Sequence, residues 1–266
     1  MQEKNKKLTK NLIYLFAITL LFAVLRCLLM ILNYNFETGF FHDRLYATAL
    51  YLSFLVICAA FLFVFKNKTS DFSYKYNNVK FDFYANLLLS AVFVGIFTTS
   101  LLSQNVTTKI ELFTKYLSLV TSGVSAFVYF AKSTLSEKTS KKAFQFLNLF
   151  PILFLIFQSI LQFMEMSGRA TTYNLFPNVF SLIILAFFVL NEEKSKILGS
   201  ASSLLPISAI TVFSLMFSVI PDVISICMGD LHVNSLKTFI LALKLLYIFI
   251  AVKHILGFLK EIKEDV

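Results

Sequence analysis

The sequence has few of the residues on which most enzyme motifs depend. It contains no tryptophan, three cysteines, three histidines, four prolines and seven glycines in 266 residues. Cys27, Cys58 and Cys227 include no CxxC pair, so they indicate neither a disulfide framework nor a metal site. No HExxH, GxGxxG or GxxxxGK[ST] motif is present, which leaves zinc-hydrolase and nucleotide-binding functions without support. We therefore expect no cofactor, no bound metal and no catalytic site.

Charged residues are also scarce, at 15% of the chain against 58% hydrophobic residues. A soluble domain has about 25% charged residues and about 45–50% apolar residues. The apolar residues here form runs of about 20, the length of a helix that crosses a bilayer, whereas barrel strands would alternate in shorter segments. The sequence thus predicts an all-α, polytopic bundle that forms one transmembrane domain over residues 1–266. The eight predicted spans are residues 12–32, 45–65, 83–103, 113–131, 143–163, 174–190, 206–228 and 236–258.

The net charge of +9 does not indicate nucleic-acid binding, because most of the basic residues lie in short segments between the spans. Successive segments between spans lie on opposite sides of the membrane. The segments on one side, with the two termini, hold 16 basic residues, and those on the other side hold three. Basic loops remain in the cytoplasm, so we expect both termini in the cytoplasm and the chain in the plasma membrane. The first apolar run is too long for a signal peptide and is predicted to be a retained anchor. The excess of Phe and Lys over Trp and Arg indicates a bacterial source.

Two of the predicted spans carry stripes of polar residues. Spacings of three, four and seven residues place each stripe on one helix face. The stripe in 206–228 consists of Ser208, Thr211, Ser214, Ser218, Asp222 and Ser225, and that in 236–258 of Lys237, Lys244, Tyr247 and His254. Charged side chains that face lipid are costly, so we expect both stripes to face protein or water.

Three charged residues lie at similar depth in different predicted spans. At 1.5 Å per residue, Arg26 and Asp222 are each about 9 Å from the outer end of their span, and Lys244 is about 12 Å from its own. We predict that Asp222 pairs with Lys244, with Arg26 or with both. Lys244 is favoured by the short loop that joins the last two spans, whereas Arg26 offers a bidentate guanidinium.

Polar residues of other spans gather at the same level, which indicates an outward-facing polar pocket. Because two cations accompany one carboxylate there, we expect a small anionic solute to be bound or transported. The predicted ligand-binding residues are Asp222, Lys244, Arg26, Ser218, Gln162 and Asn178. The alternative is a non-catalytic membrane subunit or sensor that acts with membrane or cytoplasmic protein partners. Its charges would then form a structural clasp, and its Ser and Thr would hold helices together.

The segment NEEKSK at 191–196 places two carboxylates side by side at the inner end of a predicted span. It superficially resembles the paired glutamates of intramembrane CAAX-type proteases. The arginine and the later histidines of that pattern are absent, so we reject this resemblance. We expect the segment to be an exposed, charged helix end.

Overall fold

The computed structural model describes residues 2–35, 40–41, 44–66, 79–102, 108–134, 146–167, 175–198, 203–227 and 235–264. Nearly all of these residues are helical, and the chain also forms a small hairpin in which Tyr34–Asn35 (β1) pairs antiparallel with Phe40–Phe41 (β2). The helices are α1 (Gln2–Asn33), α2 (Arg44–Lys66), α3 (Val79–Leu102), α4 (Lys109–Thr134), α6 (Leu149–Ser167), α7 (Leu175–Leu198), α8 (Leu204–Cys227) and α9 (Ser235–Glu264). The expected all-α class is therefore confirmed for the described residues.

The described part of each predicted span lies mainly on one of these helices. Six helices of the described chain are long and apolar enough to cross a membrane: α1, α2, α3, α7, α8 and α9. The other two differ for physical reasons, because α4 carries many Ser, Thr and Lys residues and the apolar part of α6 is shorter, at Leu149–Met164. The fold is helical and largely apolar, as in a multi-pass membrane protein.

The outer surface of the helical bundle supports the same conclusion. Large apolar side chains are exposed on several helices, for example Leu32 (78%), Phe63 (76%) and Leu102 (78%). A water-soluble protein seldom exposes apolar patches of this extent, whereas a bilayer accommodates them.

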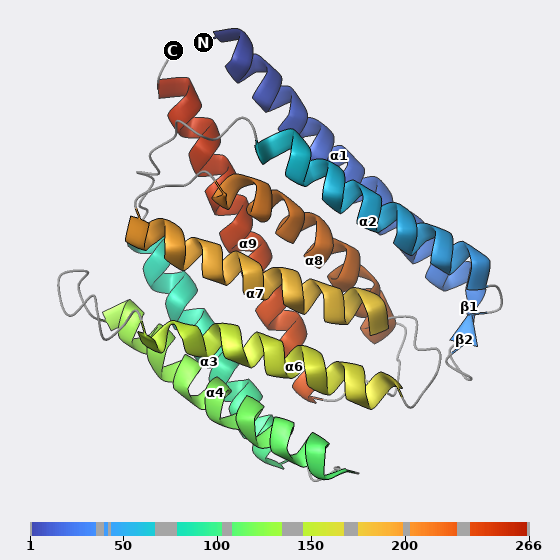
Figure 1. Ribbon diagram of the computed structural model, residues 1–266, viewed down its shortest axis with the longest axis vertical. Helices are drawn as coiled ribbons and strands as arrows, with labels where there is room; N and C mark the ends of the chain where they lie inside the picture. The colour runs from blue at the N-terminus through green and yellow to red at the C-terminus, as the bar shows by residue number, and fades with distance from the viewer. Residues whose placement is uncertain are drawn as a thin grey trace.

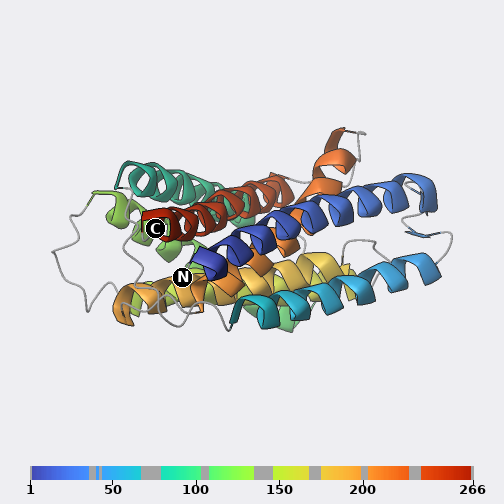
Figure 2. The ribbon, with the colours of Figure 1, turned by 90° about the horizontal axis from the view of Figure 1, so that it is seen from above.

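The helices run alternately in opposite directions (Figure 1). As a result α1 begins and α9 ends at the same end of the bundle, and the two chain ends also lie close together in the perpendicular view (Figure 2). We call this the terminal end and the opposite one, which carries the β1–β2 hairpin, the distal end. The number of helices in the described residues is even, so the first and the last of them reach the same end of the bundle.

Helix α8 is the most buried of the six apolar helices. In its most apolar stretch 83% of the residues are buried, compared with 33% for α1 and 22% for α2. It packs against α1, α2, α7 and α9, while α3 contacts α4 and α9 and α6 contacts α4 and α7. Six helices thus follow one another in contact, in the order α3, α4, α6, α7, α8 and α9, and α9 returns to α3. Helices α1 and α2 pack on the side of α8.

Candidate functional site

Lys244 of α9 forms the centre of a polar cluster in the distal half of the bundle. Its side chain is buried, and Nζ donates hydrogen bonds to Asn178 Oδ1 of α7 (2.7 Å) and to Ser218 Oγ of α8 (2.8 Å). Ser218 in turn donates to Asn178 Oδ1 over 3.1 Å. An ammonium has three donors, and the third makes no hydrogen bond within the part of the chain that the structure describes. We call Lys244, Asn178 and Ser218 the lysine site.

Arg26 of α1 approaches α8 at the same turn. It is 2% exposed, and its Nη1 donates to the backbone carbonyl of Phe217, the residue before Ser218. The guanidinium carbon also lies 4.5 Å from the centroid of the Phe217 ring, a cation–π contact. Two buried cations therefore flank one turn of α8, which is the level that the sequence predicts for them.

Asp222 lies one turn beyond Ser218 on α8 and is half-buried. Its negative charge and the positive charge of Arg26 both act on Lys244, in opposite senses. Asp222 and Arg26 thus both lie close enough to Lys244 for their charges to act on it. Whether Asp222 forms a direct ion pair with Lys244 remains a prediction.

The sixth predicted ligand-binding residue, Gln162, lies on α6. Its Oε1 atom is buried and accepts no hydrogen bond among the described residues. Gln158, one turn earlier, accepts a hydrogen bond from Ser118 of α4 over 3.2 Å. The structure thus joins Gln158 to α4 and shows no hydrogen bond between Gln162 and the lysine site, so the role of Gln162 remains a prediction.

The polar stripe of α8 has mixed roles. Ser208 donates back to the Leu204 carbonyl of its own helix, which is the structural role common for serine in spans. Thr211 and Ser214 are fully buried, and their hydroxyl oxygens make no hydrogen bond among the described residues. They lie on the same face of α8 as Ser218. The stripe therefore extends the polarity of the lysine site toward the middle of the bundle.

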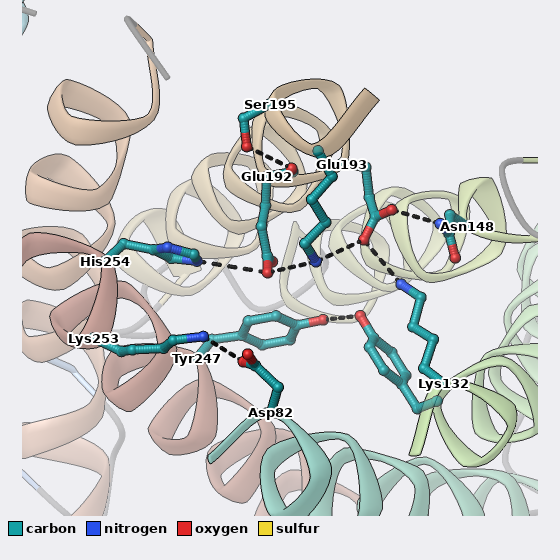
Figure 3. Close-up of polar contacts among 11 residues, drawn as sticks. Asp82, Lys132, Asn148, Glu192, Glu193, Ser195, Tyr247, Lys253 and His254 are labelled. Carbon is teal, nitrogen blue, oxygen red and sulfur yellow. Dashed lines mark hydrogen bonds and ion pairs between the residues drawn. The ribbon is translucent and has the colours of Figure 1, made fainter. Parts of the chain in front are cut away.

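A second polar cluster lies toward the terminal end and is shown in Figure 3. Glu193 of α7 accepts hydrogen bonds from Lys132 of α4 (2.9 Å) and from Asn148, which precedes α6. Glu192 of α7 lies 3.5 Å from Nε2 of His254 on α9. Two adjacent carboxylates therefore connect α7 with helices on both of its sides.

Lys196 of α7 completes this cluster from within the same helix. Its Nζ lies 2.9 Å from Glu192 Oε1 and 3.3 Å from Glu193 Oε1. We call Glu192, Glu193, Lys132, Asn148, Lys196 and His254 the glutamate cluster. A neighbouring ion pair, between Lys253 of α9 and Asp82 of α3, joins two further helices (Figure 3).

The expectation that residues 191–196 form an exposed helix end is wrong for the two glutamates. The side chains of Glu192 and Glu193 are only 15% and 12% exposed. The reason is that α7 ends beside α4 and α9, whose charged residues meet it at the same level. The signal was present in the sequence, because Lys132 and His254 also lie near the inner ends of their predicted spans.

The polar face of α9 connects the two clusters. Lys244 contacts α7 and α8, the hydroxyl of Tyr247 shares a hydrogen bond with that of Tyr129 on α4, and His254 contacts α7. Lys237, the first residue of the predicted stripe, is instead exposed. The predicted stripe thus faces protein from Lys244 onward.

Comparisons of the chain with protein-family models, with curated proteins and with solved structures find no significant match.

Proposed function

We propose that this chain is a multi-pass plasma-membrane protein that binds a small anionic solute at the lysine site and carries it across the bilayer. The observation that carries the proposal is the buried ammonium of Lys244, one donor of which is unused among the described residues. Ionisable groups within spans are costly to bury and commonly serve ligand or ion pathways. The unused donor is suited to an oxygen of a carboxylate or phosphate.

The balance of charge supports an anion in particular. Arg26 and Lys244 contribute two positive charges near this turn of α8, and Asp222 contributes one negative charge. The surplus of one positive charge would be neutralised by a bound anion. Asp222 would then orient the cations, and a proton on its carboxylate would be available if transport is coupled to protons.

We also propose the orientation and the full number of crossings. All eight helices would cross the membrane, with α4 and α6 held between more apolar neighbours. The terminal end would face the cytoplasm, because the basic segments predicted to be cytoplasmic adjoin it. The lysine site would then lie in the outer half of the membrane.

The alternative function is a non-catalytic membrane subunit or sensor. It is favoured by the three-helix arrangement of the lysine site, since one ammonium that joins α7, α8 and α9 would also serve as a clasp. In that case partner proteins would act on the chain, and no solute would enter the bundle.

A thermal-shift experiment separates the two functions. The purified full chain in detergent is heated with inorganic phosphate, small carboxylates or amino acids, each at a concentration of tens of millimolar. A ligand present at 100 times its Kd stabilises the folded state by about 2.7 kcal/mol. We expect at least one anion to raise the Tm of the wild type and not that of Lys244→Met. The exposed Lys237 provides a matched control, because Lys237→Met removes the same charge from the same helix.

Exchanging the charges of positions 222 and 244 provides a second experiment that separates the two functions. Asp222→Lys combined with Lys244→Asp should recover expression but not anion binding if the residues bind solute. If the exchanged pair recovered both expression and every other property of the wild type, the result would instead support the clasp. An anion that stabilises Lys244→Met as well as the wild type would contradict the proposed site.

A further inference from the structure

We propose that the glutamate cluster is a gate that closes the terminal end of the bundle below the lysine site. The proposal rests on the proposed function, since it assigns a means of controlling access to that same site. In the structure the gate is closed, because Glu193 holds α7 against α4 and the residues that precede α6, and Glu192 lies 3.5 Å from His254 of α9. The distal end would be the open side in this state.

The contacts of the cluster are suited to closing one end of a helical bundle. Two consecutive side chains of α7 reach partners on opposite sides of the helix, so that the loss of either carboxylate releases one side (Figure 3). The groups are almost enclosed: His254 is 2% exposed and Glu193 is 12% exposed. Charge pairs in such surroundings are screened less by salt than surface pairs.

Lys196 makes opening feasible. Breaking a buried ion pair is usually costly because it leaves a charge without a partner. Here both carboxylates also contact Lys196 of their own helix, and that side chain is 49% exposed. If α7 moved away from α4 and α9, Lys196 would still balance the glutamates. A permanent ion-pair contact between helices would not need a partner for the glutamates on α7 itself.

Helix α7 links the gate to the lysine site. It carries Asn178, which contacts Lys244, and about four helical turns later it carries Glu192 and Glu193. An anion bound to the third donor of Lys244 would draw the ammonium away from Asn178 and weaken the Lys244–Asn178 hydrogen bond. Release of that bond would favour a different position of α7 relative to α9. One rigid helix thus offers a physical connection between occupancy and closure.

Cysteine labelling tests the gate without any knowledge of the solute. The reporter is Ala251→Cys, because Ala251 is fully buried and lies on α9 between Tyr247 and His254. It is placed in the full chain with Cys27, Cys58 and Cys227 replaced by alanine. The protein is reconstituted in nanodiscs, so that a membrane-impermeant maleimide reaches both faces, and the labelling rate is followed by mass spectrometry.

We expect the maleimide to label the reporter at least about tenfold faster in Glu193→Gln than in the background. A tenfold change corresponds to a loss of about 1.4 kcal/mol in the free energy that favours the closed state. The exchanged pair, Lys132→Glu with Glu193→Lys, should return the rate toward that of the background. Lys194→Gln is the matched control, because Lys194 is exposed on the same turn and removal of its charge should leave the rate unchanged.

A second reporter distinguishes opening from unfolding. Ala23→Cys on α1 is also buried but lies far along the bundle from the cluster, so opening of the gate should leave its labelling rate unchanged and unfolding should raise it. If both reporters react in Glu193→Gln, the milder Glu193→Asp replaces it, since a shorter carboxylate cannot reach both Lys132 and Asn148.

Unchanged labelling of the Ala251 reporter in a folded Glu193 variant would overturn the gate. Equal acceleration by Lys194→Gln would do the same, because the effect would then be one of general charge. These results are independent of the anion experiment. The gate can fail while anions still bind at Lys244, and the anion site can fail while the gate still opens.

Discussion

The hydroxyl groups of Tyr129 on α4 and Tyr247 on α9 lie 2.5 Å apart and share a hydrogen bond in the bundle interior. The two side chains are only 5% and 1% exposed. Along α9 the pair lies between Lys244 and His254, so it separates the lysine site from the glutamate cluster. Phe188 of α7 contacts the Tyr247 ring edge-on, at 6.3 Å between centroids, which fixes the ring in place.

Removing one hydroxyl of this pair should destabilise the fold. Tyr247→Phe leaves the Tyr129 hydroxyl buried without its partner, which costs about 1–3 kcal/mol. Adding Tyr129→Phe removes the orphaned group, so the double variant should lose less than the sum of the single variants. The coupling energy in spans averages about 0.6 kcal/mol and reaches about 1.7 kcal/mol. Unfolding by SDS in mixed micelles measures it, with the exposed Tyr116→Phe as control; strict additivity would contradict the interaction.

Gly95 should be essential for the contact between α3 and α9. A Cβ atom at this position would overlap the Phe239 ring of α9. We expect Gly95→Ala to lower the free energy of unfolding by about 1–3 kcal/mol, the usual cost of overpacking. Phe239→Ala in the same chain should restore the space and relieve much of that loss. If Gly95→Ala were as stable as the wild type, the close approach of these helices would be wrong.

Hydropathy was sufficient to predict where the helices lie, because a span must satisfy its backbone hydrogen bonds internally. It could not distinguish the six strongly apolar helices from α4, in which five Ser and Thr residues are buried, namely Thr114, Ser118, Thr121, Ser122 and Ser125. The β1–β2 hairpin was not predicted either. Strands of two residues carry no periodicity that a sequence pattern can reveal.

Depth along the spans predicted part of the candidate site. The rise of 1.5 Å per residue is constant enough to place Arg26 and Lys244 at one turn of α8 before the helix order is known. At the terminal end the sequence predicted an exposed helix end at residues 191–196, which includes Glu193. Neighbouring helices enclose these charges, and which helices are neighbours is a property of tertiary packing.

Accessibility of introduced cysteines should establish the orientation. Lys194 at the terminal end and Lys109 at the distal end are both exposed, so cysteine is tolerated there without loss of packing. In a variant without Cys27, Cys58 and Cys227, we expect Lys194→Cys to react only from the cytoplasm. Lys109→Cys should react only from outside, and the readout is labelling of whole cells and of inverted vesicles. Labelling of both positions from one side would contradict the alternating arrangement of the helices.

Lys244→Met should leave the ligand-free protein about as stable as the wild type, or more stable. Methionine matches the length of the lysine stem, and Asn178 and Ser218 retain the hydrogen bond that already joins them. Replacing buried charges by apolar groups of similar volume is often neutral or stabilising, whereas breaking a pair that holds a fold together costs about 3–5 kcal/mol.

The sign of this change therefore decides what Lys244 does. A binding residue is kept at a cost to stability, so its removal relieves that cost, while a clasp is kept for stability alone. Thermal unfolding of the purified chain without added anion measures the difference, and Lys237→Met reports the effect of a lost lysine on the surface of α9. A loss of several kcal/mol in Lys244→Met alone would favour the subunit or sensor, because a solute site has no need to hold α7, α8 and α9 together.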